Sequence, residues 1–498
     1  MSLATVFSRA PLSLNAPLVR VEVHLASGLP ALTLVGLPEK AVKESKDRVR
    51  AAILNSGFEF PQKHITINLA PADLPKDGSR YDLAIALGIL AASGQIPAAA
   101  LTDYEWHGEL ALSGELRHVQ GILSCALAAK QAQRRIVVAP SNAAEAALVA
   151  EHNLASAHNL AEIAAVLSAR QDWQSTPQIA PQAPHYPDFA DVIGQQEAKR
   201  ALLIAAAGAH HVLMSGPPGT GKSMLAQRFA GILPPMTQTE AIESAAIQSI
   251  SPQGFQAQNW RQRPYRAPHH SSSAAALVGG GSVPKPGEIS LAHHGVLFLD
   301  ELPEFDRRVL EMLREPLENG HISISRAAMK SDFPARFQLI AAMNPCPCGY
   351  YGDPQRHCSD TPDQIARYRQ KISGPLLDRI DLHLTIARLS PQQLRQQHHA
   401  QQNSAELREQ AAAARRIALD RQGCPNALLS GQALEQHLCA EAAVYQLLDR
   451  AAEKMQLSMR SYHRLLKVAR TIADLAASPL INSTHAAEAL QYRTWNSR

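Results

Sequence analysis

The stretch that decides the fold is Gly216-Pro217-Pro218-Gly219-Thr220-Gly221-Lys222-Ser223. It fits the pattern G-x-x-x-x-G-K-[ST], in which glycines let backbone N–H groups close around phosphate oxygens at the start of a helix. Residues 211–214 before it predict a short buried strand, and residues 224–229 after it predict a helix. Because strand, loop and helix follow in the order that phosphate binding requires, a bare glycine-rich turn is the weaker interpretation.

A second motif lies about 80 residues further along the chain. The apolar run Val296-Leu297-Phe298-Leu299 is typical of a central parallel strand, and Asp300 and Glu301 follow it directly. We expect Lys222 to reach the β- and γ-phosphates of ATP, and Ser223 and Asp300 to hold Mg²⁺. Glu301 would polarise the attacking water, which predicts a hydrolase rather than a nucleotide store.

Three further polar residues are candidates for the same reaction. Asn344 ends another apolar strand predicted over 337–343, where its amide can hold the attacking water. Arg379 stands between Asp378 and Asp381, which usually means a surface ion pair of small energy. In a ring of subunits, the same arginine can reach a neighbour's γ-phosphate. Arg460 lies in the first turn of a helix predicted to open at 458, where it can contact nucleotide.

The bulk composition is that of an ordinary globular protein. The chain has 498 residues, 46% hydrophobic and 18% charged, and a net charge of +4, which permits but does not require a nucleic-acid partner. No apolar run approaches the ~18 residues that span a bilayer. The N-terminus shows no secretory signal, and six cysteines in this length do not make a disulfide scaffold. These features predict a cytoplasmic protein without a membrane partner.

The chain divides into an α/β unit, a linker, a nucleotide-binding core and a helical end. Alternating strands over 19–25 and 65–69, with helices over 38–56, 82–92 and 122–133, predict the first unit at 1–168. The proline-containing segment 169–187 predicts a semi-extended linker. We place the core at 188–388 and a C-terminal helical domain at 389–498.

Four motifs carry a resemblance to a known family. They are Arg266-Ala267-Pro268-His269-His270, Gly279-Gly280-Gly281, Pro286-Gly287-Glu288-Ile289-Ser290-Leu291-Ala292-His293 and Asn344-Pro345-Cys346-Pro347-Cys348-Gly349. The chain resembles the magnesium-chelatase-like AAA+ ATPases, and the match to their YifB/ComM branch covers essentially its whole length. The resemblance implies a P-loop NTPase core with a parallel sheet.

The function implied by the YifB/ComM branch is an ATP-dependent DNA helicase or translocase that works as a homo-hexamer. It would promote branch migration of recombination intermediates during natural transformation. The alternative is a chelatase-type ATPase that remodels a protein partner for metal insertion. The N-terminal unit argues against that alternative, because the chelatase ATPase subunit typically starts near the AAA+ core.

The resemblance also identifies two inserts in the nucleotide-binding core. Residues 265–287 would be the helix-two insert, and 321–336 would form the hairpin that precedes the sensor strand. Such hairpins line the pore in related rings, which makes Lys330 and Arg326 candidates for contacts to single-stranded or branched DNA. A solvated turn lysine is the open alternative for Lys330.

The N-terminal unit resembles the Lon-protease-like (S5 domain 2-like) α/β domain. In that family a serine nucleophile and a lysine form the catalytic pair. Here Arg80 stands where the serine would be, with Ser79 one place off, and Cys125 stands where the lysine would be. The resemblance therefore implies an inactive protease fold retained as a DNA or assembly module.

Cys346, Cys348 and Cys358 follow the sensor strand within a loop rich in glycine and proline. Thiolates this close in sequence suggest a tetrahedral zinc site. Relatives offer a fourth cysteine where this chain has Asp360, so either Asp360 or His357 would complete the site. Reduced free cysteines are the alternative.

Overall fold

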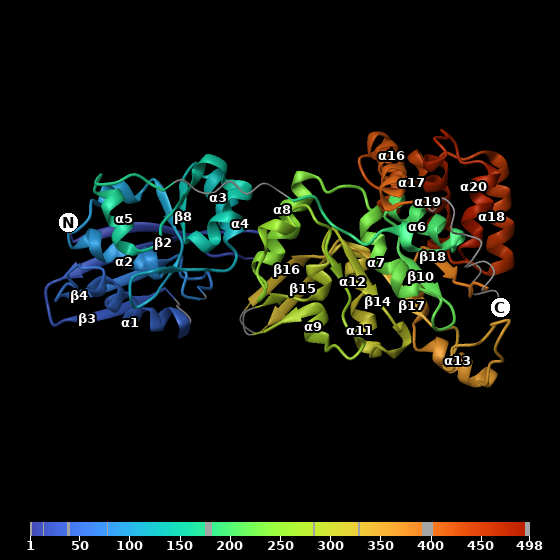
Figure 1. Ribbon diagram of the computed structural model, residues 1–498, viewed down its shortest axis with the longest axis horizontal. Coiled ribbons are helices and arrows are strands. Elements are labelled where there is room, and N and C mark those ends of the chain that lie inside the picture. The colour runs from blue at the N-terminus through green and yellow to red at the C-terminus, as the bar shows by residue number, and fades with distance from the viewer. Residues whose placement is uncertain are drawn as a thin grey trace.

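The computed structural model describes residues 2–12, 14–36, 40–76, 78–174, 182–281, 284–326, 329–390 and 402–493, and it leaves out the side chains of residues 40–43, 325, 326, 329 and 330. The molecule is elongated, with an N-terminal α/β unit at one end, a second α/β unit in the middle and helices at the other end (Figure 1). Within the described ranges, no helix combines the length and the apolar character that crossing a membrane requires.

The N-terminal unit is built on a seven-stranded sheet of order β3-β4-β2-β1-β5-β8-β9. Valines alternate along β2, so one face of the sheet is buried against α2, in which every residue is buried. The strands are β1 (Leu3–Arg9), β2 (Leu18–Ala26), β3 (Ala31–Val35), β4 (His64–Ala70), β5 (Tyr104–Trp106), β8 (Arg135–Val138) and β9 (Leu154–Ser156), with the small hairpin β6 (Glu109–Leu110) and β7 (Leu116–Arg117). The helices are α1 (Lys40–Asn55), α2 (Asp82–Ala92), α3 (Ile122–Gln131), α4 (Pro140–Ala150) and α5 (Leu160–Leu167).

The central unit carries a five-stranded, wholly parallel sheet of order β11-β14-β17-β10-β18. Its strands are β10 (Val212–Ser215), β11 (Tyr265–Arg266), β14 (Val296–Leu299), β17 (Gln338–Met343) and β18 (Leu382–Thr385). Every residue of β10, β14 and β17 is buried, as expected of apolar runs covered by helices on both faces. The helices are α6 (Gln196–Gly208), α7 (Lys222–Ile232), α8 (Gln238–Ser249), α9 (Ala274–Val278), α10 (Glu288–Leu291), α11 (Arg307–Met312), α12 (Arg314–Asn319), α13 (Pro362–Gln370) and α14 (Gly374–Leu377).

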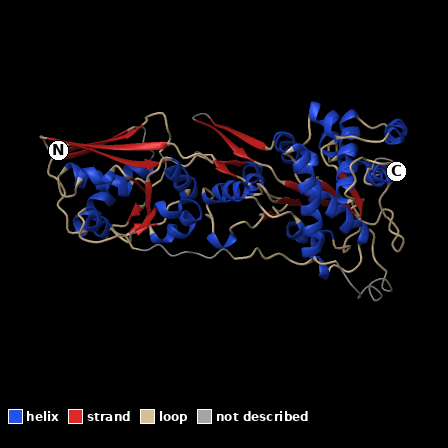
Figure 2. Cartoon of the chain, turned by 90° about the horizontal axis from the view of Figure 1, so that it is seen from above, coloured by secondary structure: helices blue, strands red, loops and turns tan. Residues whose placement is uncertain are grey.

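Two antiparallel pairs project from this core. One is β12 (Gly279–Gly280) with β13 (Lys285–Pro286), and the other is β15 (His321–Arg326) with β16 (Met329–Pro334). The β15–β16 hairpin lies on the side of the core that faces the N-terminal unit (Figures 1 and 2). An apolar cluster that includes Ile122 of α3 and Ala245 of α8 joins the two units beside it.

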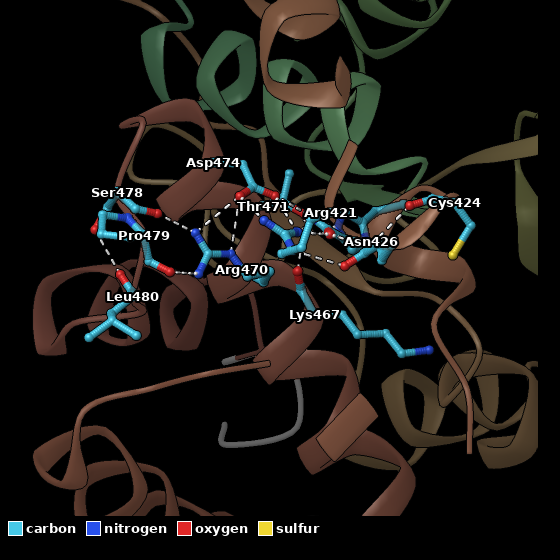
Figure 3. Close-up of polar contacts among 12 residues, drawn as sticks. Arg421, Cys424, Asn426, Lys467, Arg470, Thr471, Asp474, Ser478, Pro479 and Leu480 are labelled. Carbon is cyan, nitrogen blue, oxygen red and sulfur yellow. Dashed lines mark hydrogen bonds and ion pairs between the residues drawn. The ribbon is translucent and has the colours of Figure 1, made fainter. Parts of the chain in front are cut away.

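The C-terminal helices are α16 (Ser404–Gln422), α17 (Gln432–His437), α18 (Ala442–Met455), α19 (Met459–Leu475) and α20 (Ser483–Gln491). Of these, α16 packs on α6 and α7, and α19 packs on α6. Figure 3 shows the polar network at their centre, in which Asp474 accepts hydrogen bonds from Arg421 and Arg470. Thr471 extends the network to the core, since its Oγ1 lies 2.8 Å from Nε2 of His210, just before β10. Such a buried and paired network fixes one arrangement of the helices on the core.

Candidate active site

Three chain segments meet at the carboxyl edge of the five-stranded sheet. Because β10, β14 and β17 are neighbouring parallel strands, the residues that follow each of them lie side by side. Gly219 and Gly221 adopt φ of +78° and +88°, a region that favours glycine, so the loop after β10 can curl around a phosphate before α7 begins at Lys222. A side chain at Gly216 would stand 2.3 Å from the carbonyl oxygen of Ile386, which excludes larger residues there.

The loop and the two following strands are connected by direct hydrogen bonds. Ser223 Oγ donates to Asp300 Oδ2 at 2.6 Å, and Lys222 Nζ lies 3.3 Å from Asn344 Oδ1. Lys222 Nζ also donates to the carbonyl oxygen of Gly216 at 2.6 Å, and burial lowers the pKa of this lysine. The predicted magnesium ligands and phosphate-binding lysine are therefore together at one edge, and the hydroxyl–carboxylate pair suits the hard oxygen ligation of Mg²⁺.

Glu301 stands at the rim of this site with a partner that the sequence did not reveal. Its φ is +51°, and its backbone N–H donates to Asp300 Oδ1 at 2.9 Å. Its Oε2 lies 3.0 Å from Nδ1 of His270, which follows β11 on the next strand of the sheet. The His270 ring is nearly perpendicular to the Phe305 ring, with an interplanar angle of 81°. The only signal for this contact was the motif that contains His270, whose role sequence reasoning left unassigned.

Arg379 and Arg460 lie away from the loop of their own chain. The backbone N–H of His211, just before β10, donates to Asp381 at 2.9 Å, so Arg379 sits at the end of β10 opposite Lys222. Arg379 donates to the Glu318 carboxylate, and Arg460 Nη2 donates to the other oxygen of Glu318 at 2.9 Å. Both arginines thus bind the carboxylate of Glu318 on α12. The sequence analysis did not predict a role for Glu318.

The two DNA candidates lie on the β15–β16 hairpin. The backbone of Arg326 pairs with that of Met329, and Lys330 pairs with Ser325. The side chains of Arg326 and Lys330 are outside the described part of the structure, so their direction stays a prediction.

The structure brings the three predicted cysteines together. Their Sγ atoms are 3.4 Å (Cys346–Cys348), 3.5 Å (Cys348–Cys358) and 3.6 Å (Cys346–Cys358) apart. A carboxylate oxygen of Asp360 lies within 4.8 Å of all three sulfurs. Of the two fourth ligands left open by the sequence, Asp360 is the one in this cluster. Three sulfurs and one carboxylate oxygen are a donor set that zinc accepts.

A second cluster of possible metal ligands is formed by Glu243, His293 and His294. His293 Nδ1 accepts the backbone N–H of Arg336 at 2.9 Å, so the proton of its neutral ring is on Nε2, which faces Glu243. His294 Nε2 lies 2.6 Å from the same carboxylate. With a protonated Nε2 the cluster is a hydrogen-bonded link between α8 and the start of β14.

The side chains at the positions of the Lon-type serine and lysine have other surroundings in this structure. Arg80 donates to the carbonyl oxygen of Gln120 at 2.8 Å, and the Ser79 hydroxyl bonds to Glu109. Cys125 is fully buried, and burial raises the pKa of its thiol to about 12. Arg80 and the buried Cys125 thus do not form a serine–lysine pair, and the Ser79 hydroxyl is paired with a carboxylate and not with a lysine.

Comparison with known proteins adds the family context. Residues 188–394 match the model described as magnesium chelatase, subunit ChlI, residues 21–142 match subunit ChlI of Mg-chelatase, and residues 401–493 match its C-terminal model. The chain is 50% identical to competence protein ComM of Haemophilus influenzae over 499 residues, 99% of this chain and 98% of the relative. It is 50% identical to YifB of Escherichia coli over 496 residues, 99% and 97% of the two chains. The magnesium-chelatase 38 kDa subunit of Cereibacter sphaeroides is 26% identical over 177 residues, which cover 32% of this chain and 52% of that protein.

Proposed function

Because this chain belongs to the magnesium-chelatase-like ComM/YifB family of AAA+ proteins, we propose that it is an ATP-driven DNA motor. We infer a hexameric helicase or translocase that promotes branch migration during homologous recombination in natural transformation. The observation that carries the ATPase part is the hydrogen bond from Ser223 to Asp300 beside the Lys222–Asn344 contact. Full-length similarity to competence protein ComM supports the DNA part.

In the proposed hydrolysis, the loop amides and Lys222 bind and orient the β- and γ-phosphates. Ser223 and Asp300 would hold Mg²⁺, which supplies positive charge to the phosphate oxygens when bound. Asn344 would position the attacking water, and Glu301 would accept its proton. His270 would hold the Glu301 carboxylate in place between turnovers.

The position of the two arginines supports the proposed ring of subunits. Arg379 and Arg460 are separated from their own phosphate loop by the length of β10, so we propose that they act on the nucleotide of a neighbouring subunit. A guanidinium supplied in this way stabilises the charge of the transition state and is worth roughly 10³–10⁵ in rate. Glu318 would hold both groups side by side for that contact.

DNA contact is assigned to the β15–β16 hairpin, with Lys330 and Arg326 binding phosphate. The N-terminal unit, which we propose to be an inactive Lon-protease-like domain, would support this hairpin from the side. A cavity of about 80 Å³ between the two is lined by Arg80 and Tyr81 of the N-terminal unit and by Ser331 and Phe333 of the hairpin strand. The proposed reaction places the protein in the cytoplasm, with ATP and DNA.

A chelatase-type role is the alternative. Similarity to the 38 kDa chelatase subunit of Cereibacter sphaeroides covers 32% of this chain at 26% identity, whereas similarity to competence protein ComM covers 99% at 50% identity, which favours the DNA motor. We also propose that the cluster of Cys346, Cys348, Cys358 and Asp360 binds zinc.

Purified full-length protein with ATP and a radiolabelled three-stranded junction tests the proposal. We expect strand displacement that requires ATP, and ATP hydrolysis that rises when DNA is added. An ATP hydrolysis rate that is the same with and without DNA, together with junctions that stay intact, would contradict a DNA motor and favour the chelatase-type role.

A further inference from the structure

The cysteine loop begins beside the predicted nucleotide site. Cys346 comes two residues after Asn344, whose side chain contacts Lys222. Cys358 and Asp360 come at the end of the loop, directly before α13, which starts at Pro362 with Thr361 as its cap. A metal ion bound by all four residues would therefore fasten the end of β17 to the start of α13.

Backbone groups already point the ligands inward. The N–H of Tyr351 donates to Cys346 Sγ at 3.3 Å, and the N–H of Cys348 donates to an oxygen of Asp360 at 2.7 Å. The sulfur separations of 3.4 to 3.6 Å are far above the ~2.05 Å of a disulfide. They approach the ~3.8 Å between ligands that each lie about 2.3 Å from a tetrahedral zinc ion. The geometry is thus that of a site ready for a metal.

The same loop rests on the phosphate-binding loop. Gly349, between the ligands, has φ of +86° and lies so close to Pro218 that an added Cβ would be 2.8 Å from Pro218 Cδ. That Cβ would also be 3.8 Å from Cγ of Asn344. Gly349 is held there by its own N–H, which donates to the carbonyl oxygen of Cys346 at 3.1 Å. A shift of the metal ligand Cys348 would therefore move the adjacent Gly349, which lies against Pro218.

We propose that a zinc ion held by Cys346, Cys348, Cys358 and Asp360 braces the phosphate-binding loop, so that ATP affinity depends on occupancy of the metal site. This inference rests on the proposed zinc and ATP sites. Without the ion, only sulfur–sulfur contacts and a few backbone hydrogen bonds, such as that from Tyr351 N–H to Cys346 Sγ, are described within this loop. We expect the loop then to become looser, so that Gly349 moves away from Pro218. Asn344 then loses the support that keeps its amide beside Lys222.

The test measures zinc content and ATP affinity separately in the full-length protein. Zinc is measured by elemental analysis, and affinity by titration with a fluorescent ATP analogue, before and after chelator treatment. Cys348→Ser removes one ligand. Gly349→Ala keeps every ligand but drives a methyl group into Pro218. Gly352→Ala is the matched control, because Gly352 has φ of +78° and a Cβ there meets no atom within 4 Å.

We expect about one zinc per chain in the wild type, and a loss of ATP affinity of about tenfold on chelation that returning zinc restores. Cys348→Ser should lose zinc and affinity together, whereas Gly349→Ala should keep zinc and lose affinity about tenfold. Gly352→Ala should resemble the wild type.

Three results overturn the brace: wild-type protein without zinc, zinc-free protein with wild-type ATP affinity, or Gly349→Ala that binds ATP no worse than Gly352→Ala. None of these results contradicts the proposed ATPase activity. That proposal is contradicted by a different result, namely a Lys222→Ala protein that still binds ATP. Circular dichroism shows whether the Cys348→Ser protein is folded. If it is unfolded, the comparison of Gly349→Ala with Gly352→Ala tests the brace by itself.

Discussion

Nδ1 of His270 lies 3.0 Å from Oε2 of Glu301, across the gap between the ends of β11 and β14. Glu301 is the proposed base, and it occupies a backbone conformation with φ of +51° that L-residues rarely adopt. The imidazole therefore contacts the oxygen that would take a proton from the attacking water. A partner at this position can hold the carboxylate in or out of its working orientation.

Replacement of His270 tests this positioning role. His270→Ala should lower kcat for ATP hydrolysis about tenfold, below the ~10²–10⁴ expected from loss of a general base itself. KM should stay near the wild-type value, because Lys222 and Ser223 are untouched. Steady-state hydrolysis measures both.

His269→Ala is the control for that variant, since Nδ1 of the neighbouring His269 lies 2.8 Å from Ser271 Oγ, whereas His270 faces Glu301. If kcat for ATP hydrolysis is equal in the His270→Ala and His269→Ala proteins, the positioning role of His270 is contradicted.

The catalytic assignments themselves predict two different defects. Glu301→Gln should keep ATP binding and abolish turnover, because the phosphate and magnesium ligands remain. Lys222→Ala should weaken binding itself, since this lysine would bind the β- and γ-phosphates. A fluorescent ATP analogue measures binding and phosphate release measures turnover. Wild-type turnover by Glu301→Gln protein is the result that would dismiss the assignment of the base.

Local sequence was enough to predict the strands and loops that build the site. The apolar run 296–299 matches β14, and the motif at 216–223 gives the turn into α7, because both patterns depend on neighbours in sequence. The contacts of Glu318 and His270 could not be predicted in this way. Glu318 meets Arg460 across 142 positions, and only the packing of α19 on the core decides that pairing. Likewise, spacing left His357 and Asp360 equivalent as zinc ligands, and the hydrogen bond from Cys348 to Asp360 separates them.

The position of Arg379 predicts an active site shared between subunits. Mixing Arg379→Ala subunits with Glu301→Gln subunits should restore some hydrolysis, because mixed interfaces then contain one intact site. Glu318→Gln should also lower hydrolysis, but less than Arg379→Ala does, because it removes the charge that holds both guanidinium groups. No rescue in rings proven to mix would place Arg379 outside the reaction.

Buried histidines predict that stability falls on acidification. Burial, with Arg80 and Arg9 nearby, lowers the pKa of His107 to about 3, and burial lowers that of His383 to about 3 as well. The folded protein keeps both rings neutral while the unfolded chain takes up protons near pH 6.5. Each histidine should therefore cost about 1.4 kcal/mol of unfolding free energy per pH unit as pH falls from 6.5 toward the folded pKa.

Thermal unfolding between about pH 7.5 and about pH 5, a range that brackets the pKa of histidine in the unfolded chain, checks this sign. His107→Leu should flatten the fall of the midpoint with decreasing pH. His152→Leu, at an exposed position, is the matched control. A profile equally steep in all three proteins would contradict the role of His107.

The DNA assignment predicts a defect that spares hydrolysis. Lys330 pairs with Ser325 on the β15–β16 hairpin, and a lysine that binds phosphate adds affinity without reading sequence. Lys330→Ala should therefore reduce the salt dependence of DNA binding by about one unit of slope, and do so equally for different sequences. Basal ATP hydrolysis and ring size should be retained, whereas branch migration should fall, because the hairpin would pass ATP-driven motion to the strand. Lys285→Ala is a control that removes an exposed lysine from the neighbouring β12–β13 pair. If Lys330→Ala leaves both the salt slope and strand displacement at wild-type values, DNA is held elsewhere, and the N-terminal unit becomes the place to search.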